Sequence, residues 1–324
     1  MAEPGLEPLR DSQADDNDRL DVLPADVVSA WPISTVSLGD RTYVVRRAAG
    51  ASHPRAPAVM LHGLGGSSTD WTDLMWLLRN DVDAIAPDFN GFGQSPPPRD
   101  GDYSMSAQAR GIAGLLEREF PGQRVHVFGN SMGGAIAVQL AARHSELVKS
   151  LTLVSPALPW LRPRRTSAGL GITAVPFVGP RLYARYAKNP AEVRVRSTMD
   201  LVFADPTVVP AQRFAASVEA SQTLSRLPYA QDAFLRSLRA LLATYTERGP
   251  ERPWVIARRV SVPVLAIYGL QDKLVDPRSA HRISASFPNS RVLVLPHAGH
   301  VAQMEHPEEV AAAWRDLLVP ALEP

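Results

Sequence analysis

The sequence predicts an α/β protein with a mostly parallel central sheet, helices on both faces of the sheet, and an inserted helical cap. Short apolar stretches typical of buried strands alternate with helical patterns on both sides of residues 156–260. Within that segment the alternation stops and only helical patterns remain. Polar residues with reactive chemistry follow the strand ends, where parallel sheets form their sites. We therefore predict a core of residues 29–155 and 261–324, with residues 156–260 as the cap.

The N-terminal residues 1–28 are predicted to form a disordered acidic tail. Residues 1–30 contain eight acidic and two basic side chains, a composition that buries too little apolar surface to fold alone. They lack the apolar segment of a secretory signal, and no apolar stretch of the chain reaches the roughly 20 residues that span a bilayer. We therefore expect a cytoplasmic protein.

The composition excludes several classes of function. With 324 residues and 45% hydrophobic content, the chain can form one large domain with an insertion. Its net charge of +1 argues against a dedicated nucleic-acid binder. The absence of cysteine rules out disulfides, thiolate metal sites and a cysteine nucleophile. The sequence leaves the oligomeric state open.

The sequence shows no metal or cofactor motif. It lacks a dinucleotide or P-loop fingerprint, because the glycines of Gly63-x-Gly65-Gly66 have the wrong spacing. The histidines at positions 281, 297, 300 and 306 lack the carboxylate-bearing i,i+4 pattern of a zinc protease helix. We therefore expect neither a metal ion nor a cofactor.

The core begins with a predicted hairpin. Its two strands, Ile33–Leu38 and Arg41–Arg47, flank Gly39-Asp40, which suits a two-residue turn. Pro57–Leu61 is continuously apolar, as in a strand that is covered on both faces, and Ala84–Ala86 is a similar short strand. These stretches predict neighbouring strands of one sheet.

Two helices of this part follow from caps and periodicity. Ser67 or Ser68 can cap the first helix. One face of that helix carries Trp71, Leu74, Met75 and Leu78. The second helix is predicted over residues 105–119, and the glycine- and proline-rich loop 88–98 before it cannot form regular structure.

The most informative motif lies between an apolar strand, Val125 to Gly129, and an alanine-rich helix that begins after Gly134. It reads Gly129-x-Ser131-x-Gly133, a G-x-S-x-G pattern typical of a nucleophile elbow. Such a sharp turn holds the serine in a strained backbone conformation, and larger side chains at the glycines would collide with the strand or the helix. The pattern therefore indicates a serine hydroxyl that stands clear of the sheet.

The second half of the sequence loses and then regains the strand–helix alternation. The cap is predicted to contain helices at about residues 191–203, 211–226 and 229–246. The remaining core elements are strands Ser150–Val154, Pro263–Tyr268 and Arg291–Leu295 and helices Pro277–Phe287 and Pro307–Leu318.

Candidate partners for the serine follow two strands of the resumed core. Asp272 comes just after the first of these strands, and His300 follows the second. A serine hydroxyl is a poor nucleophile until a base takes its proton, and the base needs an anion to orient it. Asp276 is an alternative acid, although it better suits a helix start, and His297 is an alternative base.

Together these motifs resemble the α/β-hydrolase fold family, in its lid-bearing branch of serine esterases and lipases. The resemblance covers nearly all of residues 33–320 apart from the cap. It implies Ser131 as the nucleophile, His300 as the base and Asp272 as the orienting acid.

The resemblance also implies an oxyanion hole. In that family the H-G-x-G loop after an early strand supplies one donor, here the Leu64 amide, and the Met132 amide supplies the other. Gly63, Gly65 and Trp71 are candidates for the substrate pocket, although Trp71 better suits the core.

Three other polar residues receive structural interpretations. His62 is interpreted as a loop histidine. Asp88 is expected to bind backbone amides of its loop, and Glu305 is expected to anchor the histidine loop.

We expect a serine hydrolase that cleaves a carboxylic ester with an apolar or lipid-like acyl group through an acyl-enzyme. The elbow and the segment around His300 also resemble C–C bond hydrolases of aromatic-ring degradation, although no single cap arginine stands out as a carboxylate clamp. A ligand receptor that retains the triad is a third hypothesis. Haloalkane dehalogenases and most epoxide hydrolases are disfavoured because they use aspartate where Ser131 stands.

The sequence of the cap does not fully determine what the protein binds. It contains sixteen basic and seven acidic side chains, and an apolar run from Ala168 to Pro180 that glycine and proline interrupt. This run could line an acyl tunnel, contact a membrane surface or pack on the core. The basic side chains could attract anionic substrates or lipids, or form solvated helix faces. We expect a small apolar substrate, with peripheral membrane contact through the cap as a further hypothesis.

Overall fold

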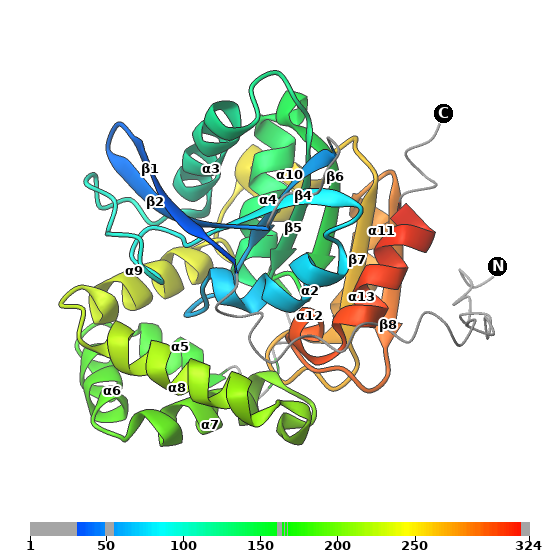
Figure 1. Cartoon of the computed structure of the whole chain (residues 1–324). Helices are drawn as coiled ribbons and strands as arrows, with labels where there is room; N and C mark the ends of the chain where they lie inside the picture. Colours follow the sequence, from blue (N-terminus) through cyan, green and yellow to red (C-terminus); the bar gives the residue numbers. More distant parts are fainter. Residues whose placement is uncertain (1–30, 49–54, 161–163, 165, 167, 319–324) are drawn as a thin grey trace.

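The computed structural model describes residues 31–48, 55–160, 164, 166 and 168–318, so the predicted acidic tail, residues 1–28, lies outside the described residues. Eight strands form one sheet in the order β1-β2-β4-β3-β5-β6-β7-β8 (Figure 1). The strands are β1 (Ile33–Leu38), β2 (Arg41–Arg47), β3 (Ala56–Leu61), β4 (Val82–Pro87), β5 (Val125–Asn130), β6 (Val148–Val154), β7 (Val264–Gly269) and β8 (Ser290–Leu295).

The sheet is antiparallel at one edge and parallel elsewhere. β1 and β2 form the predicted hairpin, and β2 also pairs antiparallel with β4. All neighbouring pairs among β3 to β8 are parallel. The carboxyl ends of these six strands therefore meet at one end of the sheet, and the predicted fold class is confirmed.

Helices cover both faces of the sheet (Figure 1). They include α2 (Thr72–Leu77), α3 (Met105–Glu119), α4 (Met132–Arg143), α10 (Pro253–Ala257), α11 (His281–Ser286) and α13 (Pro307–Ala313). Successive strand residues point to opposite faces, so Val59 and Leu61 of β3 join one hydrophobic cluster, whereas Ala58 and Met60 join another. The first cluster includes side chains of α3, α4, α10 and α11, and the second includes side chains of α2 and α13.

Two predicted helices of the C-terminal core are interrupted. The helix predicted over Pro277–Phe287 begins as the 3₁₀ turn η7 (Pro277–Ala280), and α11 follows it. The helix predicted over Pro307–Leu318 is α13 followed by a π-helical turn, Trp314–Leu318. Apolar periodicity does not separate these helix types, because their spacings differ by less than one residue per turn on either side of 3.6. The short helices α10 and α12 (Ala302–Glu305) were not predicted from the sequence, because a single turn is too short to show an apolar period.

Between β6 and β7 the described residues form helices and loops without a strand. The larger helices are α5 (Ala168–Ala174), α6 (Val178–Ala187), α7 (Ala191–Val202), α8 (Ala211–Ser225) and α9 (Ala230–Ala243), and they gather on one side of the molecule (Figure 1). α7, α8 and α9 agree with the predicted cap helices, whereas α5 and α6 occupy most of the interrupted apolar run. In the described part of the chain, no helix has the length and apolar character to cross a bilayer.

Two contacts place this segment over the carboxyl ends of the strands. Phe234 of α9 packs against Gly65 in the loop after β3, where a Cβ would lie 3.4 Å from the ring. The amide of His300, in the loop after β8, donates a 2.7 Å hydrogen bond to the carbonyl of Val202 at the end of α7. That residues 156–260 form a cap stays a prediction, and we keep the name cap for this segment.

Candidate active site

Ser131 lies between β5 and α4 in the strained conformation that its motif predicts. Its backbone has φ 52° and ψ −115°, a region that non-glycine residues rarely adopt. A Cβ at Gly129 would lie 2.6 Å from the carbonyl oxygen of Gly133, and a Cβ at Gly133 would collide with the carbonyl oxygen of Leu61. The two glycines therefore let α4 start close to β5 and β3.

The loop after β3 lies beside the serine. A 3.2 Å hydrogen bond from the Gly66 amide to the Gly63 carbonyl closes a turn. Gly65 has φ 79° at the third position of this turn, where a positive φ favours glycine. A Cβ at Gly63 would lie only 3.4 Å from the Cβ of Ser131. Glycine thus allows the loop backbone to approach the serine.

The predicted oxyanion donors occupy the two segments that flank the serine. Leu64 is the second residue of the turn after β3, and Met132 is the first residue of α4. An amide in the first turn of a helix has no acceptor within the helix, and the helix dipole favours negative charge there. The position of Met132 therefore suits an amide that would bind an oxyanion, and the role of the Leu64 amide stays a prediction.

His300 and Asp272 form a buried pair at the ends of β8 and β7. His300 Nδ1 and Asp272 Oδ2 are 2.8 Å apart, and their side chains are 5% and 0% exposed. The second carboxylate oxygen accepts hydrogen bonds of 2.7 and 2.9 Å from the amides of Leu274 and Val275. Burial raises the pKa of Asp272, but the facing imidazole and these hydrogen bonds outweigh burial and hold the pKa below its ordinary value. Asp272 is therefore ionised at neutral pH and orients the imidazole through Nδ1.

Asn130 connects the serine elbow to the histidine loop, a role absent from the sequence predictions. Its Nδ2 donates hydrogen bonds to the carbonyls of His300 (3.0 Å) and Val154 (3.1 Å). Because Asn130 directly precedes Ser131, these bonds hold the elbow and the base loop side by side. Its position inside the G-x-S-x-G motif is the signal that could have identified it.

The alternative acid and base have other partners. Asp276 caps η7 by accepting a 3.0 Å hydrogen bond from the Arg278 amide, and its carboxylate also binds the Arg278 guanidinium. His297 Nε2 lies 2.6 Å from Glu309 Oε1. The contact between Asp272 and His300 favours these two residues over the alternatives.

His62 and Asp88 stabilise the loops after β3 and β4, as the sequence predicts. His62 Nε2 accepts a 3.0 Å hydrogen bond from the amide of Phe89. Burial lowers the pKa of His62, although Asp88 opposes the shift, so the ring is neutral and can accept. The two carboxylate oxygens of Asp88 accept hydrogen bonds from the amides of Ser68 (2.7 Å) and Gln94 (2.8 Å).

Glu305 joins the base loop to the segment after α7. Its Oε2 accepts a 2.6 Å hydrogen bond from the Gly299 amide, which confirms the predicted anchoring of the histidine loop. Its Oε1 accepts bonds from the amides of Ala204 (2.6 Å) and Asp205 (3.2 Å), which the sequence does not predict. One carboxylate therefore links the cap to the loop of His300.

Lys273 makes a similar connection from the acid loop. Its Nζ donates hydrogen bonds to the carbonyls of Asp200 (2.6 Å) and Phe203 (3.1 Å). Because Lys273 directly follows Asp272, the end of α7 is bonded to both loops of the acid–base pair. Sequence reasoning missed Lys273, since a lone lysine beside an aspartate carries no local signal of its partner.

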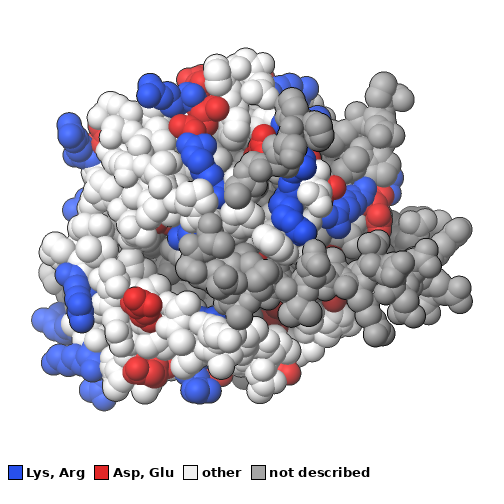
Figure 2. Space-filling view, in the orientation of Figure 1, with Lys and Arg blue, Asp and Glu red and all other residues white. Residues whose placement is uncertain are grey.

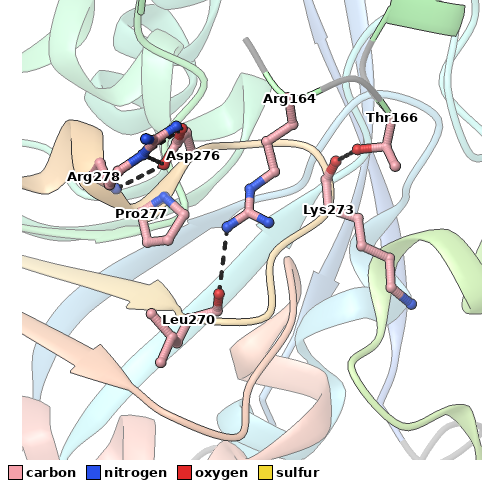
Figure 3. Close-up of a pocket in the computed structure, with 7 residues that line it drawn as sticks. All are labelled: Arg164, Thr166, Leu270, Lys273, Asp276, Pro277 and Arg278. Carbon is pink, nitrogen blue, oxygen red and sulfur yellow. Dashed lines mark hydrogen bonds and ion pairs between the residues drawn. The ribbon is translucent and has the colours of Figure 1, made fainter. Parts of the chain in front are cut away.

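A cavity of about 560 Å³ lies beside the acid loop (Figure 3). It is lined by Arg164, Thr166, Leu270, Lys273, Asp276, Pro277 and Arg278. Arg164, a cap residue, points toward the acid loop and donates a 3.5 Å hydrogen bond to the carbonyl of Leu270. The cavity thus combines a cap arginine with Lys273 next to the acid–base pair.

The candidate pocket residues lie apart from this cavity. Gly63 contacts the elbow, and Gly65 lies under Phe234 of α9. Trp71 is fully buried and packs at an angle against Phe128, with ring centroids 6.5 Å apart. Gly63 therefore lies beside Ser131, Gly65 lies beside the cap helix α9, and Trp71 belongs to the core.

Among the described residues, His297, His306 and Glu309 bring three potential metal-ligating atoms within 4.8 Å of one another. The spacing rule for zinc protease helices does not cover this group, because His297 comes from a loop. Imidazole and carboxylate are ligands that Zn²⁺ accepts, but His297 and Glu309 already bind each other at 2.6 Å. The group lies outside the serine, acid and base assembly.

Comparison with known proteins identifies the family. A model described as alpha/beta hydrolase fold matches residues 57–307. The chain is 30% identical over 272 residues to Lipase 1 of Psychrobacter immobilis, covering 81% of this chain and 77% of that protein. It is 28% identical over 273 residues to 2-hydroxy-6-oxo-6-(2'-aminophenyl)hexa-2,4-dienoic acid hydrolase of Metapseudomonas resinovorans, covering 81% and 83%.

Solved structures agree on the fold. The 2-hydroxy-6-oxo-6-phenylhexa-2,4-dienoate hydrolase from Rhodococcus sp. strain RHA1 is similar with a TM-score of 0.69 and 22% identity, covering 88% of this chain and 98% of that one. The residues matched by the family model run from β3 through the elbow and the cap to the histidine loop, so they include every candidate catalytic residue. The chain belongs to the α/β-hydrolase fold family.

Proposed function

We propose that this α/β hydrolase cleaves a carboxylic ester with an apolar or lipid-like acyl group, using Ser131, His300 and Asp272 as its triad. The observation that carries the proposal is the buried 2.8 Å contact between His300 and Asp272, beside a serine with φ 52°. The similarity to a lipase supports an ester as the substrate.

The proposed reaction has two steps. Ser131 Oγ attacks the ester carbonyl carbon while His300 Nε2 accepts the hydroxyl proton, and ionised Asp272 stabilises the imidazolium. His300 then gives this proton to the leaving alcohol as the C–O bond breaks, which produces an acyl-enzyme. A water molecule then attacks the acyl carbon while His300 takes its proton, and His300 returns this proton to Ser131 Oγ as the bond between Oγ and the acyl carbon breaks and the acid leaves.

The Leu64 and Met132 amides are the proposed oxyanion donors in both steps. Each such donor typically contributes about 10²–10³ in rate. Gly63 would border the substrate because it keeps the loop backbone close to Ser131, and Gly65 would border it because its positive φ shapes the same turn. Trp71 would act on the pocket only through packing, since its side chain is fully buried.

The test is a panel of p-nitrophenyl esters of rising acyl length, measured with the wild type and Ser131→Ala. We expect kcat/KM to rise with acyl length, and we expect Ser131→Ala to lose at least about 10⁴-fold in kcat without unfolding. Ser145→Ala, an exposed serine beyond α4, is the matched control and should retain full activity. Full activity in Ser131→Ala would disprove the proposal, and a single slow turnover with a lasting change of the cap would indicate the ligand receptor.

C–C bond hydrolysis is the second candidate. Two observations favour it: the 28% identity to the dienoic acid hydrolase, and the Arg164 guanidinium of the cap in the cavity beside Asp272. An arginine there could bind the carboxylate of such a substrate. Faster turnover of a vinylogous diketone acid than of any ester, with a large KM increase in Arg164→Gln, would favour this candidate over the esterase.

A further inference from the structure

Five large apolar side chains are exposed on α5, α6 and the turn between them. Their exposed fractions are 55% for Ile172, 45% for Val175, 79% for Phe177, 42% for Val178 and 41% for Leu182. We call these five residues the hairpin patch. They account for five of the eleven exposed large hydrophobic side chains of the described residues, within eleven consecutive positions. Such a concentration is typical of an interaction surface.

Phe177 is the most exposed member of the patch and has an unfavourable backbone conformation. It precedes α6 with φ 67° and ψ −34°, where glycine would cost less. Folding therefore explains neither the size nor the exposure of this side chain. A contact outside the molecule would explain both.

Basic side chains accompany the hairpin patch. Val178 and Leu182 of the patch are four residues apart and lie on one side of α6. The exposed basic residues of α6 and its C-terminal end are Arg181, Arg185 and Lys188. The chain contains no aspartate or glutamate between positions 146 and 192. Figure 2 shows lysine and arginine side chains along the left and lower edge of the cap, where Figure 1 places α6.

Helices α5 and α6 and the turn between them form a helical hairpin, which we call the hairpin from here on, and its inner side packs on α9. Arg239 of α9 donates a 2.9 Å hydrogen bond to the carbonyl of Ala174, and the rings of Tyr183 and Phe234 have centroids 5.5 Å apart. Phe234 in turn covers Gly65 of the loop beside Ser131. One helix layer therefore separates the hairpin from the candidate oxyanion loop.

We propose that the hairpin patch docks on the surface of a bilayer that contains anionic lipids. The apolar side chains would enter the interface, and Arg181, Arg185 and Lys188 would lie near the lipid phosphates. The positive charge of this segment favours an anionic bilayer over a second copy of the chain as the partner of the patch. A second copy would place two basic segments without acidic residues against each other. The proposal concerns binding and does not depend on which bond the triad cleaves.

The test measures binding of the full chain to vesicles by co-sedimentation, with Ser131→Ala as background so that no lipid is consumed. Phosphatidylglycerol–phosphatidylcholine vesicles are compared with pure phosphatidylcholine vesicles. We expect tighter binding to the anionic vesicles, and weaker binding as ionic strength rises from about 0.1 to 1 M. Phe177→Asp should weaken the binding at least about tenfold, and Arg185→Gln should weaken it about fivefold on the anionic vesicles alone.

Two substitutions elsewhere on the cap serve as matched controls. Val208→Asp changes another exposed apolar side chain, at 48% exposure, and Arg226→Gln removes another exposed charge. Both should bind like the parent protein. Equal binding of Phe177→Asp and its parent, or no binding to anionic vesicles, would overturn the proposal. So would light scattering that shows a dimer of the parent which Phe177→Asp converts to a monomer, because the occupant would then be a second copy.

Discussion

The end of α7 and the α5–α6 hairpin belong to the same inserted segment, but they have different surroundings. The residues at the end of α7 are bonded to the loops of the proposed acid and base through Glu305, Lys273 and the amide of His300. The hairpin contacts α9 and turns five large apolar side chains toward solvent.

From this difference we expect the two parts of the cap to have different roles. Displacing the end of α7 would break five hydrogen bonds next to the acid–base pair, so we expect the geometry of the pair to depend on this end. The hairpin has no such role beside His300, and its composition suits contact with a partner. We expect substitutions at the anchored end to affect catalysis and stability, and substitutions in the hairpin to affect recruitment.

The largest effect on the anchored side is expected from Asp272→Asn. The amide cannot stabilise the imidazolium or hold the same tautomer, so kcat should fall about 10⁴-fold with the fold retained. Steady-state kinetics and circular dichroism would measure this. Asp276→Asn is the control, because its side chain can still cap η7, and it should change kcat less than about threefold. A decrease in kcat of less than tenfold in Asp272→Asn would contradict the assignment of Asp272 as the orienting acid.

The pH dependence of stability tests the buried core beneath the elbow. Burial, with a smaller effect of Lys149, lowers the pKa of His126 from 6.5 to about 4. The unfolded chain therefore binds this proton more tightly, so the contribution of His126 to stability is complete above pH 6.5 and is lost as the pH falls toward 4. The loss from this one group is at most roughly 3 kcal/mol.

His126→Phe should remove this part of the pH dependence while keeping a ring against Trp314. The measurement is urea unfolding of both proteins at several pH values between about 4 and 7. The substitution also removes the 2.7 Å hydrogen bond between His126 and Ser150, and this loss should lower the free energy of unfolding by the same amount at every pH. The readout is therefore the slope of the free energy of unfolding against pH. Identical slopes for the two proteins would show that His126 does not titrate as inferred.

Glu305→Gln tests the connection between the anchored end and the base loop. Glutamine has one acceptor oxygen where the carboxylate accepts from the amides of Gly299, Ala204 and Asp205. We expect the free energy of unfolding to fall by about 2 kcal/mol and kcat to fall about tenfold. Glu308→Gln, at an exposed position of α13, is the control for both measurements. Unchanged kcat with reduced stability would limit Glu305 to a structural role.

The smallest effect is expected from Phe177→Gly in the turn between α5 and α6. Glycine adopts positive φ without the steric cost of a Cβ, and the lost side chain is 79% exposed. Thermal unfolding should show a stability equal to or up to about 1 kcal/mol above the wild type, with the turnover of soluble esters unchanged. A clear loss of stability would mean that the hairpin is needed for the fold, which would remove the contrast with the anchored end.

Regions of the molecule also differ in how much of their structure could be predicted from the sequence. The strain of Ser131 and the need for Gly129 and Gly133 were predictable, because a sharp strand-to-helix turn imposes local backbone limits. The same holds for the N-cap residue of the 3₁₀ turn η2 (Ser68–Trp71), which follows β3 and leads into α2, since the structure selects Ser67 from the two candidates. α5 and α6 were not predicted as helices, because Gly and Pro interrupt the run and the helices owe their stability to packing on α9.

By itself, the sequence determined the fold class, the order of the core elements and the residues that could form a serine, acid and base assembly. These properties follow from apolar periodicity and short motifs, which act over a few residues. Only the tertiary structure decided that Asn130 binds the carbonyl of His300, 170 positions away, that Glu305 joins the base loop to the cap, and that the hairpin patch faces solvent. Such contacts depend on how distant segments meet in space, and no local pattern encodes them.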